Sequence, residues 1–121
     1  MAIILIADDD PPIRELLQRI LENQGHTVVT FSNGKGIFDF LKKEKADLVI
    51  TDLIMPDKEG LETIRELQQT HPEIKVIAMS GGGRDKPDDY LNMALAFGAG
   101  KALTKPFTKQ EVISAINEAL S

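Results

Sequence analysis

Acidic side chains gather at two points in the sequence, and each point follows a short apolar run. Asp8, Asp9 and Asp10 come directly after the apolar residues 3–7, and Asp52 follows a second such run. Carboxylates that are brought together repel one another and raise one another's pKa, so a cluster of them calls for a bound cation. Oxygen ligands, in a chain without cysteine, favour Mg²⁺ or Mn²⁺ over zinc.

Other polar groups follow apolar runs later in the chain. Ser80 and Gly81 come after one run, and Lys105 comes after another. A hydroxyl, a glycine N–H and an ammonium are suitable partners for the oxygens of a phosphoryl group, and a carboxylate can be the nucleophile that becomes an aspartyl phosphate. If the fold brings these groups together, the sequence predicts phosphoryl transfer to Asp52.

The elements that must position these residues can be predicted from five apolar runs of strand length, separated by segments with room for a helix. The runs are residues 3–7, 27–30, 48–51, 76–79 and 102–104. Runs that are continuously apolar are typical of parallel strands covered on both faces. Right-handed crossovers place helices on both faces of such a sheet. We therefore predict an α/β fold, a doubly wound (βα)5 three-layer sandwich with a flavodoxin-like parallel sheet and strand order 2-1-3-4-5.

The segments between the runs are amphipathic and predict five helices. They cover residues 11–25, 35–43, 58–69 and 87–97, with a last one after residue 108. Pro11 and Pro12 suit a first helical turn, and Asp10 is expected to cap it. Thr108 and Glu111 have the spacing of a capping box. Gly60 is expected to permit close packing near the start of the third helix.

In doubly wound sheets the ligand site lies beyond the carboxyl ends of the strands, where the winding direction reverses. Here that point is the crevice between the first and third strands. Asp8, Asp9 and Asp52 lie beside this crevice, with Ser80 and Lys105 on the same edge. The two histidines, His26 and His71, fall in predicted loops away from it and are interpreted as surface residues.

Composition restricts the possible functions. A length of 121 residues, with 42% hydrophobic and 27% charged residues, indicates one globular domain over residues 1–121. The net charge of −5 and the lack of a basic stripe argue against direct nucleic-acid binding. The apolar residues 3–7 are too short for a membrane span and lack a cleavage site, so no membrane association is expected. The absence of cysteine fits a cytoplasmic location.

The chain resembles the receiver domains of two-component response regulators along its whole length. The matching motifs are Asp8-Asp9, Asp52 within Asp52-Leu53-Ile54-Met55-Pro56, Ser80, and Lys105 within Lys105-Pro106-Phe107. The resemblance implies that Asp52 is the phosphoacceptor. It implies a Mg²⁺ site formed by Asp8, Asp9, Asp52 and the backbone carbonyl of Ile54.

The resemblance also implies roles for other residues and for other proteins. Ser80 and Lys105 would contact the phosphoryl group, and the bond between Lys105 and Pro106 would be cis. The phosphoryl donor would be a phosphohistidine on a histidine kinase or a histidine phosphotransfer protein. Phosphorylation would change the face formed by the fourth helix, the fifth strand and the fifth helix, and an unknown protein target would bind there.

One position departs from the receiver pattern. Ala102 stands three residues before Lys105, where receivers usually carry Tyr or Phe. No ring can therefore move there with Ser80. Our hypothesis is that the signal passes through residues 81–98, with Tyr90 or Phe97 as substitutes for the missing ring.

Alternative functions stay open from the sequence. Phosphatases with an aspartate nucleophile have similar sites, but they usually carry a second Asp where this chain has Ile54. A flavin mononucleotide binder would need a Ser/Thr/Gly phosphate loop where this chain has Asp8 to Asp10. A third alternative is a pseudo-receiver that no longer accepts phosphate. The chain is either a stand-alone receiver or the receiver part of a longer, for example transcriptional, regulator.

Overall fold

The computed structural model describes residues 2–53, 60–80, 95 and 98–121. Within these residues the strands are β1 (Ile3–Ala7), β2 (Thr27–Phe31), β3 (Leu48–Asp52), β4 (Lys75–Ser80) and β5 (Lys101–Thr104). The helices are α1 (Pro11–Asn23), α2 (Gly34–Leu41), α3 (Gly60–Thr70) and α5 (Lys109–Leu120). The helix predicted at 87–97 lies outside the described residues, apart from Leu95. None of the described helices combines the length and the apolarity that a membrane crossing requires.

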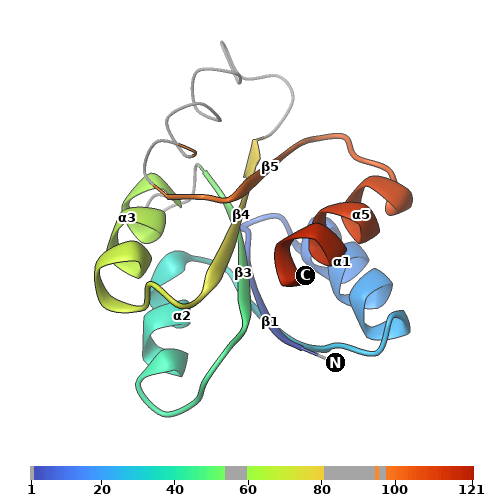
Figure 1. Ribbon diagram of the computed structural model, residues 1–121. Helices are drawn as coiled ribbons and strands as arrows, with labels where there is room; N and C mark the ends of the chain where they lie inside the picture. The colour runs from blue at the N-terminus through green and yellow to red at the C-terminus, as the bar shows by residue number, and fades with distance from the viewer. Residues whose placement is uncertain (1, 54–59, 81–94, 96–97) are drawn as a thin grey trace.

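The strands form one parallel sheet in the order β2-β1-β3-β4-β5, which confirms the predicted topology. Helices α1 and α5 cover one face of this sheet, and α2 and α3 cover the other (Figure 1). The described chain is therefore the predicted three-layer sandwich. All five strands point their carboxyl ends to the same edge, because every pair of neighbours is parallel.

The inner strand β1, which lies between β2 and β3, has a continuously apolar sequence for a structural reason. Ile4 and Ile6 pack in the core cluster on the side of α1 and α5, whereas Leu5 and Ala7 pack on the side of α2 and α3. All four side chains are fully buried. Because successive strand residues point to opposite faces, a strand between two helical layers needs an apolar residue at every position. Burial of each large side chain contributes roughly 1.5–3 kcal/mol.

The two ends of α1 agree only in part with prediction. Gly25 follows the helix with a φ of 89°, a left-handed conformation that suits glycine. Asp10 occupies the N-cap position, but its side chain makes no capping hydrogen bond, so the predicted cap is wrong. The Asp10 N–H instead donates to Asp8 Oδ1 at 2.9 Å. The carboxylate that organises this turn is therefore Asp8.

The start of α5 confirms its predicted capping box. The Glu111 N–H donates to Thr108 Oγ1 at 3.1 Å, and the Thr108 N–H donates to Glu111 Oε1 at 2.8 Å. Helix α2 differs from prediction, since it covers Gly34–Leu41 rather than residues 35–43. Asn33 caps it, with Oδ1 accepting from the Lys35 N–H at 3.0 Å.

Gly60 lies at the start of α3, directly against the end of β3. A Cβ atom at this position would collide with the Asp52 carbonyl oxygen and would lie 2.6 Å from Leu53 Cα. The Gly60 N–H also donates to the Leu53 carbonyl at 2.9 Å. The predicted close packing at Gly60 is confirmed, and it holds the backbone that carries Asp52.

Candidate phosphoryl and metal site

Four of the predicted site residues lie together at the carboxyl edge of the sheet. Asp8 follows β1, Asp52 ends β3, and Lys105 follows β5. Asp8 is fully buried, Asp52 is 8% exposed, and Asp9 is exposed. One carboxylate oxygen from each of Asp8, Asp9 and Asp52 can be chosen so that all three lie within 4.8 Å of one another. The topology thus brings together acidic groups that are far apart in the sequence.

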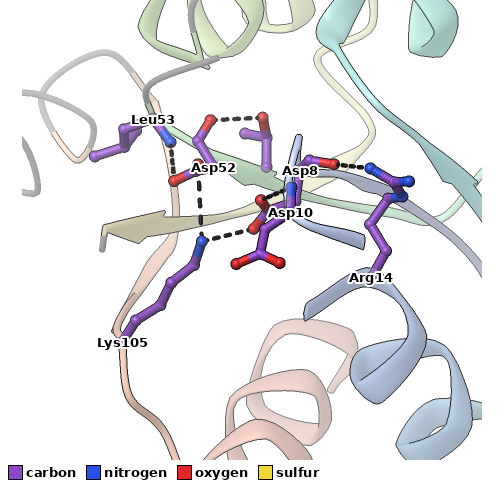
Figure 2. A network of polar contacts seen from close by, with 7 residues as sticks. Asp8, Asp10, Arg14, Asp52, Leu53 and Lys105 are labelled. Carbon is purple, nitrogen blue, oxygen red and sulfur yellow. Dashed lines mark hydrogen bonds and ion pairs between the residues drawn. The ribbon is translucent and has the colours of Figure 1, made fainter. Parts of the chain in front are cut away.

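Lys105 supplies a positive charge within this acidic group. Its Nζ lies 2.7 Å from Asp8 Oδ2 and 3.7 Å from Asp52 Oδ2, so the ammonium stands between the two carboxylates (Figure 2). The Lys105 N–H donates to the Ser80 carbonyl at 2.8 Å and extends the pairing of β4 with β5 past the strand end. The Lys105–Pro106 peptide bond is cis, as the resemblance implies.

Asp8 is held at both its backbone and its side chain. Its N–H donates to the Phe31 carbonyl at 3.1 Å, and its carbonyl accepts from Arg14 Nη1 at 2.6 Å. Its Oδ1 accepts from the Asp10 N–H and its Oδ2 from Lys105 (Figure 2). A buried carboxylate with a partner at each oxygen is fixed in one orientation.

Asp52 is an unusual carboxylate because its pKa is raised to about 6. Burial is the largest cause, and the nearby Asp8 charge adds to it. The Lys105 charge and the Leu53 N–H, which donates to Asp52 Oδ1 at 3.0 Å, act in the opposite direction. The Thr51 hydroxyl donates to the Asp52 carbonyl at 3.0 Å and fixes the backbone.

The donor set of this site fits a hard divalent cation. Three carboxylates face one ammonium, so the local charge is negative, and every candidate ligand atom is an oxygen. Mg²⁺ prefers carboxylate oxygens together with water, and the exposed Asp9 leaves one side of the group open to solvent. The residues present therefore fit Mg²⁺. Ile54 and Gly81, which were also predicted to take part, lie outside the described residues.

The remaining predicted residues are placed as follows. Ser80 ends β4, is 3% exposed, and pairs in register with Thr104 at the same edge. Ala102 is half-buried on the face of the sheet that α2 and α3 cover. His26 is not a plain surface residue, since it is half-buried and its Nδ1 accepts from the Ala2 N–H at 3.1 Å.

Sequence reasoning missed one residue that contacts the site. Arg14 was not singled out, although its guanidinium donates to the Asp8 carbonyl. A weak signal was available, because Arg14 is a basic residue in the first turn of α1, where positive charge is unfavourable.

This geometry can be compared with known proteins. The sequence profile described as response regulator receiver domain matches residues 4–117. The chain belongs to the response regulator receiver domain family. Its role is therefore that of a phosphoacceptor receiver in two-component signalling. Members of this family receive their phosphoryl group from histidine kinases.

Three relatives illustrate the receiver family. The DNA-binding transcriptional regulator NtrC of Azospirillum brasilense is 34% identical over 99% of this chain, and the match covers 24% of NtrC. The response regulator receiver protein CpdR of Brucella abortus is 30% identical over 97% of this chain and 95% of CpdR. The crystal structure of a receiver domain protein from Clostridium thermocellum has a TM-score of 0.88 at 34% identity, over 99% of this chain and 94% of that one.

The lengths of these relatives differ from one another. The receiver chain spans about a quarter of the transcriptional regulators NtrC and GlrR, 48% of the transcriptional regulator CpxR, and 95% of CpdR. Both of the predicted settings, a stand-alone receiver and the receiver part of a longer regulator, are compatible with these matches.

Proposed function

We propose that Asp52 accepts a phosphoryl group from a phosphohistidine of a histidine kinase or histidine phosphotransfer protein in the cytoplasm. Mg²⁺ would be held by Asp8, Asp9, Asp52 and the backbone carbonyl of Ile54, and Mn²⁺ would substitute for it. The observation that carries the proposal is the position of Asp52, a buried carboxylate at a strand end that shares the Lys105 ammonium with the neighbouring Asp8 carboxylate.

The chemical step requires an ionised Asp52 oxygen. Oδ1 accepts from the Leu53 N–H, whereas Oδ2 lies 3.7 Å from Lys105 Nζ and has no hydrogen bond to the described residues. Oδ2 is therefore the oxygen from which we expect the new O–P bond to form. The N–P bond of the phosphohistidine breaks, and its electron pair returns to the imidazole nitrogen, so no oxidant or further reactant is needed.

The other residues of the site would stabilise charge and orient the transferred group. When bound, Mg²⁺ offsets the negative charge that several carboxylates and a phosphoryl group bring together. Lys105 is near enough to Asp52 to contact a phosphoryl oxygen after a small movement of its flexible side chain. Ser80 and the N–H of Gly81 would donate to the other oxygens.

The output of the switch would be binding of a protein target. A phosphoryl group shifts the population toward an active arrangement only if it interacts better with that arrangement. Because Ala102 has no ring, we propose that residues 81–98 carry the change, with Tyr90 or Phe97 in place of the usual aromatic side chain. The proposal includes no enzymatic turnover of an external substrate, because Ile54 stands where the related phosphatases carry their second Asp.

The deciding experiment is intact-mass spectrometry after incubation with Mg²⁺ and acetyl phosphate. We expect one phosphate adduct on the wild type and none on Asp52→Asn. Asp10→Asn is the matched control, because Asp10 is an exposed neighbouring carboxylate whose side chain makes no capping bond. An adduct on Asp52→Asn, or no adduct on a wild type that measurably binds Mg²⁺, would contradict the proposal.

A further inference from the structure

Arg14 reaches from α1 back to the turn that carries the acidic residues. It is the fourth residue of the helix, and its backbone N–H donates to the Asp10 carbonyl at 3.1 Å. Its half-buried side chain turns toward β1, where Nη1 donates to the Asp8 carbonyl at 2.6 Å (Figure 2). The helix and the end of β1 are therefore joined by a charge-assisted hydrogen bond, which is stronger than a bond between neutral groups.

This placement is unfavourable for the helix alone. The amino end of a helix carries a partial positive charge, and a cation in the first turn is repelled by it. The first turn of α1 itself holds no acidic residue, and the nearest carboxylate along the chain is that of the exposed N-cap residue Asp10. A residue that breaks a local rule is expected where it serves a site, and the bond to Asp8 is the interaction that Arg14 gains in return.

The bond acts on Asp9 as much as on Asp8. The Asp8 carbonyl and the Asp9 N–H belong to one planar peptide group, so the bond from Arg14 fixes the plane that precedes Asp9 Cα. The Asp10 N–H belongs to the next peptide group, and its bond to Asp8 Oδ1 fixes the plane that follows Asp9 Cα. Together the two bonds set the backbone angles of Asp9.

The Asp9 side chain depends on this backbone for its direction. It is exposed, and within the described residues it makes no hydrogen bond or ion pair. One of its oxygens nevertheless lies within 4.8 Å of oxygens of Asp8 and Asp52. No side chain in the described part of the chain therefore holds the Asp9 carboxylate in this group. The carboxylate is directed there by the orientation of the Asp9 Cα–Cβ bond, which the backbone sets.

We propose that Arg14 is a positioning residue for Mg²⁺, acting through the peptide plane between Asp8 and Asp9 to hold the Asp9 carboxylate toward Asp8 and Asp52. The proposal rests on the proposed function for the identity of the ion. Arg14 itself contacts neither the ion nor the phosphoryl group. Groups that orient metal ligands in this way typically change metal affinity by about 10–100-fold when they are removed.

The test compares Arg14→Met with Arg19→Met, an exposed arginine on the same helix. Mn²⁺ alone is titrated into each protein and the free ion is followed by electron paramagnetic resonance, with Mg²⁺ affinity obtained by competition. We expect Arg14→Met to weaken binding of both ions about tenfold or more, and Arg19→Met to leave it unchanged. Equal affinities for the two variants would overturn the proposal.

A double-mutant cycle with Asp9→Asn separates positioning from a general loss of structure. If Arg14 acts through Asp9, Arg14→Met causes little further loss of Mn²⁺ affinity once Asp9 is Asn. Additive losses would overturn the proposal. Arg14→Lys, which keeps a charged donor, should recover part of the affinity, and amide exchange of Asp9 and Asp10 should rise in Arg14→Met without a matching rise in the sheet. Failure of the proposed function would appear differently, as a wild type that takes up no phosphate at Asp52.

Discussion

The ammonium of Lys105 donates a hydrogen bond to the fully buried carboxylate of Asp8, with 2.7 Å between Nζ and Oδ2. The corresponding distance to Asp52 Oδ2 is 3.7 Å, beyond a hydrogen bond. The Lys105 ammonium therefore offsets the negative charge of Asp8 more than that of Asp52. The pKa of Asp52 stays raised in spite of the nearby ammonium. This unequal sharing of one positive charge leads to the first prediction.

Replacement of Lys105 by Met should have opposite effects on stability and on Mg²⁺ binding. Without Mg²⁺, Asp8 would be a buried charge without its partner, and the free energy of unfolding should fall by about 3 kcal/mol. Mg²⁺ should bind more tightly, because a positive charge next to its site is removed. Urea denaturation and calorimetric titration measure the two effects. Lys101→Met is the control, since Lys101 pairs with Glu118 at the opposite edge and is partly exposed; weaker Mg²⁺ binding in Lys105→Met would contradict the prediction.

Asp52 should make stability depend on pH in a direction opposite to most carboxylates. Its pKa in the folded state is about 6, against an ordinary value of 3.8, so the folded state holds its proton more tightly than the unfolded state does. The resulting stabilisation is fully present below pH 3.8 and is lost as the pH rises through 6. At pH 7 without Mg²⁺, Asp52→Asn should therefore be more stable than the wild type, by up to about 3 kcal/mol.

The measurement for Asp52 is urea denaturation of both proteins between pH 4 and 7, in a metal chelator. The difference between them should shrink steadily as the pH is lowered. Asp10→Asn, which removes an exposed carboxylate near the same edge of the sheet, is the matched control. A stability difference between Asp52→Asn and wild type that stays constant with pH would show that the carboxylate does not titrate as inferred.

Gly60→Ala should destabilise the fold and reduce phosphoryl acceptance together. The added methyl group would collide with the backbone of Asp52 and Leu53, which cannot move aside as a side chain could. Overpacking of this kind costs about 1–3 kcal/mol, and the shift displaces Asp52. Gly100→Ala is the control, because a Cβ there would lie 3.9 Å from the Val76 carbonyl oxygen, an ordinary contact. Thermal unfolding and the rate of adduct formation report the two effects, and a Gly60→Ala protein that matches Gly100→Ala would refute the argument.

His26 should destabilise the protein when it is protonated. Its Nδ1 accepts the Ala2 N–H, which only a neutral ring can do, and burial lowers its pKa below 6.5. The stabilisation is therefore present above pH 6.5 and is lost as the pH falls through the lowered pKa. In His26→Gln this loss between pH 7 and 5 should be absent. His71→Gln should keep it, because the His71 ring contacts the hydroxyl of the neighbouring Thr70 rather than a distant part of the chain.

The fold was predictable because its signals are local and repeated. Continuous apolar runs predicted the strands. Because parallel strands end at the same edge of a sheet, the residues that end or follow them were predicted to meet there, namely Asp8, Asp52, Ser80 and Lys105. The capping box at Thr108 was also predictable, because both of its hydrogen bonds join residues three apart. At Asp10, by contrast, residue type alone predicted a side-chain cap, but Pro12 at the second helical position has no N–H to donate to it, and no capping bond forms.

The finer geometry of the site could not be predicted for a physical reason. Residue spacing places Lys105 at the correct edge, but its preference for Asp8 over Asp52 depends on side-chain positions that differ by about an ångström. The bond from Arg14 to the Asp8 carbonyl depends on the angle at which α1 leaves β1, which no sequence pattern encodes. Asn33 was missed because a capping residue beside two glycines gives only a weak signal.

The contact between Asp8 and Lys105 joins residues that are 97 positions apart. At a ribosomal rate of about 5–20 residues per second, the lysine is made roughly 5–20 seconds after the aspartate. For that interval the nascent chain has an acidic group without the cation that will compensate it. Metal ions or a chaperone that met the growing chain in this window would encounter a different electrostatic surface from the one that the finished protein presents.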